Sequence, residues 1–301
     1  MRPTLRQLQY LIAIADTGRF SDAAKRLHVS QPSLSTQIAE MEAELDCALL
    51  ERGRARTFLT PVGEEVVRRA RRILSEVEDM KAVTRETALG LAGRLRLGVL
   101  PSVGPYLLPT ATKRLHTEFP ELRLLVSEEK TEDLETHLTN GAFDIIISTP
   151  EDHSVHVSEP LFEEKLWICA APDHALSQSK DPIPLSSLQG LPLLSLGPGH
   201  RLSQLIAELA REAGGRVGGE YQGTSLDATR QMAVMGSGVA VLPSLYVKLE
   251  AQRDKDITVR PISDDMARRT ISLIWRRQSP LSNKFSALAA MLRETAQDLL
   301  K

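Results

Sequence analysis

One helical pattern runs almost without a breaker from residue 61 to residue 90 and divides the sequence into three parts. Residues 1–60 hold short helical patterns separated by small polar residues, and residues 94–301 alternate short β-branched runs with helical stretches. A chain of 301 residues exceeds the size at which a single hydrophobic core keeps growing. The sequence therefore predicts a small helical domain at 1–60, a connecting helix at 61–90 and an α/β region at 94–301.

The composition excludes several classes of protein. A hydrophobic fraction of 42% and a charged fraction of 25% are ordinary for globular proteins and exclude wholesale disorder. The formal net charge of -2 excludes a globally basic coat for nucleic acid, so such contact requires a local patch. Two cysteines are too few for a disulfide framework, no apolar run has membrane-spanning length, and residues 1–19 lack a signal-peptide core. We therefore expect a soluble, cytoplasmic protein without a membrane segment, metal or cofactor.

Three short helices are predicted in residues 1–60. The first ends at Gly18, Ser21 is expected to cap a second helix at 22–27, and Ser30 is expected to cap a third with Pro32 in its first turn. The apolar face of the first helix is formed by Leu8, Leu11, Ile12 and Ala15. The inward stripe of the third helix is formed by Leu34, Ile38, Met41 and Leu45. Helical spacing in both sets predicts a small three-helix core.

The outer side of the third helix is polar and uncharged in its first half. A short helix, a tight turn and a second helix place such a face in the major groove of DNA, where hydroxyl and amide groups bond base edges and phosphates. The alternative is a solvated polar face on a small helical bundle. The DNA contacts expected from these helices are Ser21, Gln31, Pro32, Ser33, Ser35, Thr36 and Gln37.

A basic segment follows, which reads as two short strands around a turn at residues 49–60. Arg52, Arg54 and Arg56 alternate along it, so a period of two places all three side chains on one side. A β wing with three guanidinium groups beside a recognition helix is suited to phosphate or minor-groove contact. A solvated charge cluster near Glu51 is the alternative.

The connecting helix carries a narrow apolar seam with heptad spacing, which weakens toward its C-terminal end. Arginines flank the first half of the seam and acidic residues flank its second half. The helix can therefore pair antiparallel with a second copy of itself, because opposite charges then face each other. Packing on its own domain is the alternative. The seam consists of Val66, Ala70, Ile73, Val77 and Met80.

Residues 94–301 read as an α/β region of two subdomains, approximately 94–163 with 268–301, and 164–267. Strands are expected at 94–100, 122–128, 144–149, 166–170, 193–196, 220–223, 239–242, 258–261 and 271–275, and helices at 106–119, 132–138 and 283–300. The first three strands end at Ser102, Ser127 and Ser148-Thr149. Ligands of open α/β sheets bind at the carboxyl ends of strands, so these hydroxyls are expected to line a ligand cleft.

The chain resembles the LysR-type transcriptional regulators over essentially its whole length. The matching motifs, in residue type and spacing, are LRQLQYL at 5–11, FSDAA at 20–24, VSQPSLS at 29–35 and LTPVG at 59–63. The resemblance implies a winged helix-turn-helix, a dimerising linker helix and a two-subdomain effector domain similar to type II periplasmic binding proteins. It also implies homodimers or homotetramers that bind an interrupted palindrome in double-stranded DNA, bend it in response to a ligand, and contact RNA polymerase.

The effector region is similar to the OxyR, peroxide-sensing, branch of this family, at residues 101–109, 199–200, 224–226 and 236–243. In that branch a reactive cysteine directly follows the Gly-His pair, where this chain has Arg201. The second cysteine lies nine residues further on, where this chain has Ala210. The comparison implies that both sensor cysteines are missing and that this chain does not sense peroxide through their disulfide.

The inducer is expected to be small, and anionic if Arg201 faces the cleft, because a guanidinium group pairs bidentately with carboxylate or phosphate. The alternative is that Arg201 pairs with a local acid. The residues expected to bind the ligand are Ser102, Val103, Ser127, Ser148, Thr149, His200, Arg201, Thr224 and Ser225.

Other reactive groups are expected to be structural. Cys169 lies in a predicted strand and reads as a buried thiol, with a lone redox sensor as the alternative. Cys47 reads as a packing residue. His153 and His156 have a metal-like spacing, but their polar surroundings favour a solvated loop.

The sequence therefore predicts a DNA-binding regulator and not an enzyme, since it contains no phosphate loop, no nucleophile elbow and no paired cysteines. A ligand-binding module without a DNA role is the alternative from another class.

Overall fold

The computed structural model describes residues 3–53, 56–84, 93–179, 181–218, 225–254 and 256–301. The chain divides into two compact units, residues 1–88 with 139–142, and residues 89–138 with 143–301. None of the helices in the described part of the chain combines the length and the hydrophobicity of a membrane-spanning segment.

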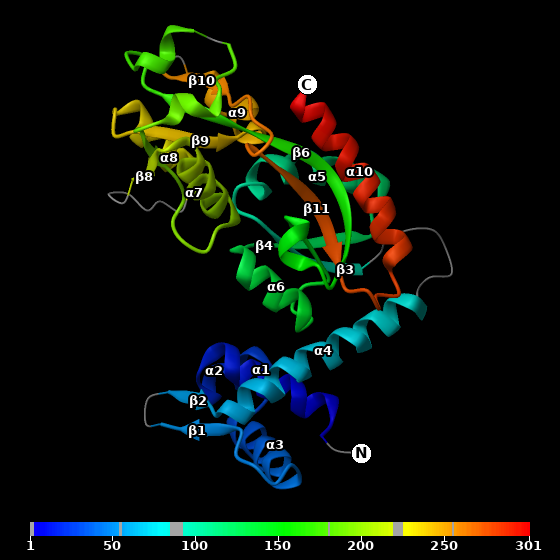
Figure 1. Ribbon diagram of the computed structural model, residues 1–301. Helices are drawn as coiled ribbons and strands as arrows, with labels where there is room; N and C mark the ends of the chain where they lie inside the picture. Colours follow the sequence, from blue (N-terminus) through cyan, green and yellow to red (C-terminus); the bar gives the residue numbers. More distant parts are fainter. Residues whose placement is uncertain (1–2, 54–55, 85–92, 180, 219–224, 255) are drawn as a thin grey trace. The chain divides into compact units, whose positions relative to one another are not determined.

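The first unit is a helical domain with a two-stranded wing and a long helix (Figure 1). The helix-turn-helix prediction is confirmed in outline, but the predicted cap of the second helix was wrong. That helix starts one residue before Ser21, and Arg19 is its N-cap without a side-chain hydrogen bond. The elements are α1 (Leu5–Thr17), α2 (Phe20–Arg26), α3 (Gln31–Glu44), β1 (Leu50–Arg52), β2 (Thr57–Leu59) and α4 (Pro61–Thr84).

Local signals explain the boundaries of the other helices. Thr4 and Gln7 form a capping box at the start of α1, and Gly18 ends it in the left-handed conformation that glycine adopts without strain. Ser30 caps α3, where its Oγ accepts a hydrogen bond from the amide of Ser33 at 3.3 Å. The hydrophobic core of the unit is formed by apolar residues from all its helices, among them the fully buried Leu11, Leu34, Ile38 and Met41.

The second unit contains a mixed sheet of nine strands in the order β4-β3-β5-β11-β6-β9-β7-β8, with β10 paired to β6. Its strands are β3 (Gly93–Val99), β4 (Leu122–Glu128), β5 (Ile145–Ser148), β6 (Val157–Ala170), β7 (Pro192–Leu194), β8 (Arg216–Val217), β9 (Val239–Pro243), β10 (Thr258–Pro261) and β11 (Arg268–Trp275). Its helices are α5 (Gly104–Glu118), α6 (Thr131–Thr139), α7 (Arg201–Ala213), α8 (Leu226–Val234), α9 (Ser244–Leu249) and α10 (Ser282–Leu300). Its 3₁₀ turns are η1 (Pro150–His153), η2 (Ala175–Gln178), η3 (Leu185–Leu188) and η4 (Ala251–Arg253). The strand expected at 220–223 lies outside the described residues.

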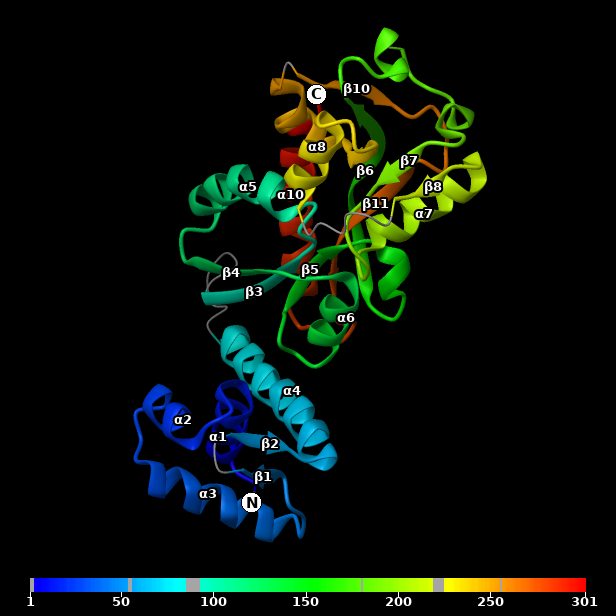
Figure 2. The ribbon, with the colours of Figure 1, turned by 90° about the vertical axis from the view of Figure 1, so that its left-hand side faces the viewer.

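Two separate hydrophobic cores divide this unit into two lobes. Lobe I is built around β3, β4, β5, α5, α6 and α10, and lobe II around β7, β9, α7 and α8. The long strands β6 and β11 lie side by side and antiparallel, as both ribbon views show (Figure 1, Figure 2). On β6, Leu161 and Phe162 belong to the core of lobe I, while Leu166 and Ile168 belong to that of lobe II. The strand β6 therefore connects the lobes directly.

Candidate DNA interface and effector site

The outer face of α3 is available for recognition. Its inward residues Leu34, Ile38 and Met41 are 0% exposed, which fixes the rotation of the helix. The predicted contact residues fall on the opposite side: Gln31, Pro32, Ser33 and Thr36 are exposed, and Ser35 and Gln37 are half-buried. Ser21 is exposed on α2. The structure thus presents hydroxyl and amide groups on one helix surface, the chemistry that reads base edges.

The wing corrects the expectation for its three arginines. The chain reverses between β1 and β2, where the amide of Gly53 donates to the carbonyl oxygen of Arg56 at 3.0 Å. Arg52 ends β1 and Arg56 directly precedes β2, so a period of two along one strand does not apply to them. Arg54 and the side chain of Arg52 lie outside the described residues.

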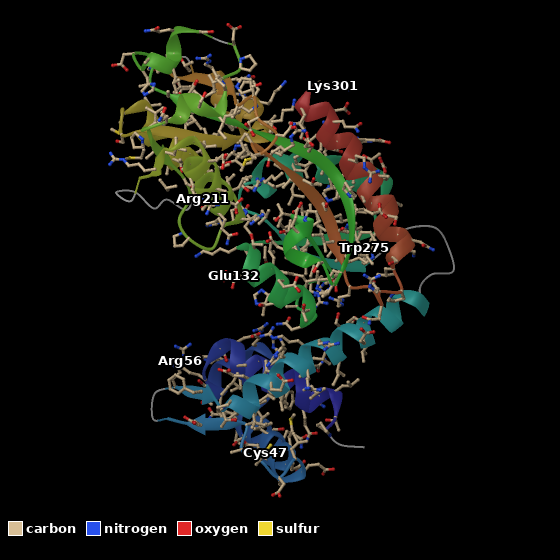
Figure 3. All side chains as sticks on the ribbon, viewed as in Figure 1. Cys47, Arg56, Glu132, Arg211, Trp275 and Lys301 are labelled. Atoms are coloured by element: carbon tan, nitrogen blue, oxygen red, sulfur yellow. The ribbon has the colours of Figure 1, made fainter. Side chains whose placement is uncertain are left out.

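Arg56 is held against the end of α1. The amide of Thr57 donates to the carbonyl oxygen of Gly18 at 2.9 Å, and a Cβ at Gly18 would lie 2.6 Å from Nε of Arg56. Figure 3 labels this arginine beside the wing. The absence of a side chain at residue 18 therefore lets the arginine lie over the end of the helix.

Replacing Gly18 with alanine is expected to weaken DNA binding about 3- to 10-fold, because the methyl group displaces Arg56 and strains a residue at φ 69°. Fluorescence anisotropy with a DNA duplex measures the effect. The control is Gly190→Ala, which also changes a glycine at positive φ but has nothing within 4 Å of its Cβ position. Equal losses in the two variants would show that Arg56 is not positioned in this way.

The seam of α4 is partly used within its own domain. Ala70 is fully buried and Val66 packs against the same core, whereas Ile73 is 45% exposed and Val77 is half-buried. The side chain of Met80 lies outside the described residues. Among the seam residues whose side chains the structure describes, Ile73 and Val77 therefore remain outside that core and accessible to a partner helix.

Ser102 joins a buried ion pair that the sequence did not reveal. Arg269 on β11 donates from Nε and Nη2 to Oε2 of Glu164 on β6, at 2.8 and 2.6 Å. Nη2 also donates to Oγ of Ser102 at 2.9 Å, and the side chains of Arg269 and Glu164 are 4% and 0% exposed. Burial raises the pKa of Glu164, against the lowering effect of Arg269. This pair lies where β6 passes between the two cores. It therefore connects the β3–α5 loop to the connecting strands.

The hydroxyl groups of Ser148 and Thr149 are already hydrogen-bonded to other residues of lobe I. The fully buried imidazole of His153 lies between Oγ of Ser148, 2.9 Å from Nε2, and Oε2 of Glu135, 2.5 Å from Nδ1. His156 contacts the other oxygen of Glu135 at 3.2 Å. The prediction of a solvated loop was therefore wrong, because Glu135 on α6 supplies a carboxylate that contacts both histidines. No group of three metal-ligating side chains is found among the described residues.

The remaining residues predicted to bind the ligand do not share one surface. Val103 is fully buried in lobe I, Ser127 is exposed on β4, and Ser225 caps α8 by accepting from the amide of Ala228 at 3.4 Å. Thr224 lies outside the described residues. His200 is 5% exposed, and burial followed by Lys130 lowers the pKa of its imidazole.

Arg201 connects the two lobes. Its Nε lies 3.9 Å from Oδ2 of Asp152 in lobe I, and Oγ1 of Thr149 donates to the same oxygen at 2.5 Å. Of the predicted ligand residues, the structure thus brings Thr149 and Arg201 together, with Asp152 between them. Asp152, Thr131, Glu164 and Arg269 were not predicted as site residues, because their partners are distant in sequence.

Cys169 lies on β6 with 0% exposure, and burial raises the pKa of its thiol to about 12. A buried thiol with a raised pKa stays protonated at pH 8, so we expect alkylation of Cys169 only after unfolding. Cys47, which is half-buried, serves as the internal reference. Peptide mass spectrometry after iodoacetamide treatment measures both, and labelling of native Cys169 at the rate of Cys47 would contradict the expectation.

Comparisons with known proteins agree with this architecture. Residues 5–64 match the family of bacterial regulatory helix-turn-helix proteins of the lysR type, and residues 88–297 match the LysR substrate binding domain. The DNA-binding transcriptional dual regulator OxyR of Escherichia coli K12 is 36% identical over 290 residues, which cover 96% of this chain and 94% of that protein.

Solved structures extend the likeness to the whole chain. A full-length OxyR variant from Pseudomonas aeruginosa has a TM-score of 0.79 at 31% identity, covering 96% of this chain and 97% of that one. Full-length CbnR complexed with its target DNA has a TM-score of 0.68 at 25% identity, covering 98% and 99%. The chain belongs to the LysR family of DNA-binding transcriptional regulators, with an N-terminal helix-turn-helix and a two-lobed effector domain.

Proposed function

We propose that this protein regulates transcription as a homodimer or homotetramer that binds an interrupted palindrome and bends the DNA when a small inducer binds between lobes I and II. The observation that carries the proposal is the uncharged polar surface of α3, presented beside a wing that fixes Arg56. Two copies joined through Ile73 and Val77 of α4 would present two such helices. RNA polymerase is the proposed partner at the promoter, and residues 1–60, 61–90 and 94–301 are the proposed functional divisions.

The proposed signal is not a disulfide. The resemblance implies that Arg201 and Ala210 stand where the peroxide-sensing branch has its cysteines. Cys169 is buried with a raised pKa. Redox sensing through Cys169 is therefore the weaker candidate. Arg201, whose side chain is 29% exposed, favours an anionic inducer.

A gel shift at about 50 and 200 mM salt tests the proposal on an operator obtained by in vitro selection and on scrambled DNA. With 6–10 phosphate contacts, affinity should fall by about 10³–10⁵ between these salts, and the operator should be preferred at both. Equal affinity for the two DNAs would favour a ligand-binding module without a DNA role.

A further inference from the structure

The base of the wing is a short stretch of backbone that contacts both α3 and α4. Oε1 of Glu42, in the last turn of α3, accepts hydrogen bonds from the amides of Leu49 and Leu50 at 2.8 and 3.1 Å. The carbonyl oxygen of Leu49 accepts from the amide of Thr60, which directly precedes α4, at 3.0 Å. A Cβ at Gly63 would clash with the same carbonyl oxygen, so the first turn of α4 packs directly on it. The peptide groups of Leu49 are therefore bound by α3 through the amide and by α4 through the carbonyl.

The segment between α3 and β1 needs this acceptor because its end is buried. The helix ends at its C-cap Leu45, and the chain then turns through Asp46 at φ 50°. Leu49 and Leu50 are 0% and 7% exposed. Main-chain amides in such a segment require an acceptor from the protein, and a carboxylate oxygen is a stronger acceptor than a neutral one. The recognition helix itself supplies that acceptor through Glu42.

The strand that follows Arg56 is held at both of its ends. At its start, the amide of Thr57 donates to the carbonyl oxygen of Gly18 at the end of α1, at 2.9 Å. At its other end, Leu59 lies opposite Leu50 of β1, whose amide is bound by α3. Loss of the second anchor would leave the wing attached to α1 but free to shift relative to α3. The contact from α3 to the wing base therefore decides where Arg56 lies relative to the recognition surface.

We infer that Glu42 is a positioning residue, which sets the spacing between the base-reading surface of α3 and the phosphate-contacting Arg56 of the wing. Both sets of contacts form on one duplex only when their spacing matches that of the groove and the phosphate backbone. The carboxylate of Glu42 acts through the wing and not by contact with DNA. The inference rests on the proposed function, because it requires that the domain binds DNA.

Electrostatics alone predicts the opposite result, which makes the inference testable. Removing a carboxylate from a DNA-binding domain lowers its repulsion of phosphates and strengthens binding. The positioning role instead predicts that Glu42→Ala weakens binding. Glu44 lies two residues further along the same helix and is exposed. Glu44→Ala therefore removes the same charge at a matched position and serves as the control.

Anisotropy titrations of the full-length protein with the selected operator and with scrambled DNA, at several salt concentrations, measure the effect. Glu42→Ala should weaken binding to both DNAs about 3- to 10-fold and reduce the salt slope by up to about one for each protomer, while the operator preference is kept. Glu42→Gln should stay within about 2-fold of the wild type, because its amide oxygen accepts the same two hydrogen bonds. Glu42→Asp keeps the charge on a shorter side chain and should weaken binding as Glu42→Ala does. Glu44→Ala should bind like the wild type or more tightly.

A double variant tests whether the residue acts through the wing. In a chain that already carries Arg56→Ala, the further change Glu42→Ala should have little effect, because the group that it positions is gone. Additive losses would show that Glu42 acts on DNA binding by another route.

Hydrogen exchange measured by mass spectrometry tests the wing base without DNA. Peptides that contain Leu49 and Leu50 should exchange about 5-fold faster or more in Glu42→Ala and Glu42→Asp than in the wild type. Peptides from α1 should exchange at the wild-type rate, which shows that the domain remains folded. Unchanged exchange at the wing base would contradict the anchoring role.

The outcomes separate this inference from the proposed function. Wild-type affinity of Glu42→Ala, or Glu42→Gln as weak as Glu42→Ala, would overturn the positioning role and leave a DNA-binding regulator intact. A loss of affinity in Glu44→Ala equal to that in Glu42→Ala would overturn it as well. A wild-type protein with equal affinity for operator and scrambled DNA would overturn the proposed function, and this inference with it.

Discussion

Replacing Arg269 with methionine is expected to lower the free energy of unfolding of the α/β unit by about 3–5 kcal/mol, because the change leaves a buried carboxylate without its cation. Glu164 is 0% exposed and its Oε2 accepts two hydrogen bonds from Arg269. Its Oε1 is buried without a hydrogen-bond partner in the described part of the chain, and the backbone hydrogen bond from Leu245 does not replace the positive charge of Arg269. Ser102 would lose its donor in the same variant.

The double variant Glu164→Leu with Arg269→Met is expected to recover most of this loss, because a buried ion pair contributes little net stability compared with apolar residues of similar size. Urea unfolding followed by tryptophan fluorescence measures both variants. The signal reports only the α/β unit, since the two tryptophans of the chain, Trp167 and Trp275, both lie in its strands. A single variant that loses less than about 1 kcal/mol, or a double variant as unstable as the single one, would contradict the assigned role of the pair.

The second large effect concerns DNA. Ser33→Ala or Gln37→Ala should weaken binding to the selected operator by about 2–6 kcal/mol, since a lost base contact costs about 1–3 kcal/mol and a two-fold dimer loses it twice. Binding to scrambled DNA should hardly change, because base contacts do not contribute there.

Arg56→Ala should instead weaken binding to both DNAs and reduce the salt slope by about one for each protomer. Ala43→Ser, an exposed change near the other end of α3, is the control. Anisotropy titrations at several salt concentrations distinguish the two patterns. If Arg56→Ala lost the preference for the operator while Ser33→Ala and Gln37→Ala kept it, the assigned roles would be wrong. Arg56 would then read bases, and Ser33 and Gln37 would only position the protein on the DNA.

Local signals predicted much of the fold. Gly18 and Ser30 marked helix boundaries correctly, and Thr258–Pro261 is a strand with the predicted bounds. A strand was predicted only from residue 166, whereas β6 begins at Val157 and contains Pro160, a residue that is rare inside strands. The sheet accommodates this proline at a register shift between Ile271 and Ser272 of the neighbouring strand, a tertiary feature without a local signal.

The site was harder to predict because its partners are distant in sequence. Arg269 and Glu164 are separated by 105 residues and meet only through the pairing of β11 with β6. His153 and its acidic neighbours read as a solvated loop, since the carboxylate of Glu135 comes from a helix 18 residues earlier. In the wing, the prediction applied the two-residue period of a strand to Arg52 and Arg56, which lie on opposite sides of a chain reversal. Predicted hydroxyls such as Ser148 were placed correctly at strand ends, but packing gave them partners within lobe I.

A hydroxyl-radical footprint of the full-length protein on an operator selected in vitro is the decisive measurement for the paired recognition helices. We predict two protected half-sites related by two-fold symmetry, with centres separated by about 10–10.5 base pairs or a multiple of that spacing. A single protected patch, or protection that does not differ between operator and scrambled DNA, would contradict a dimer that reads DNA through α3.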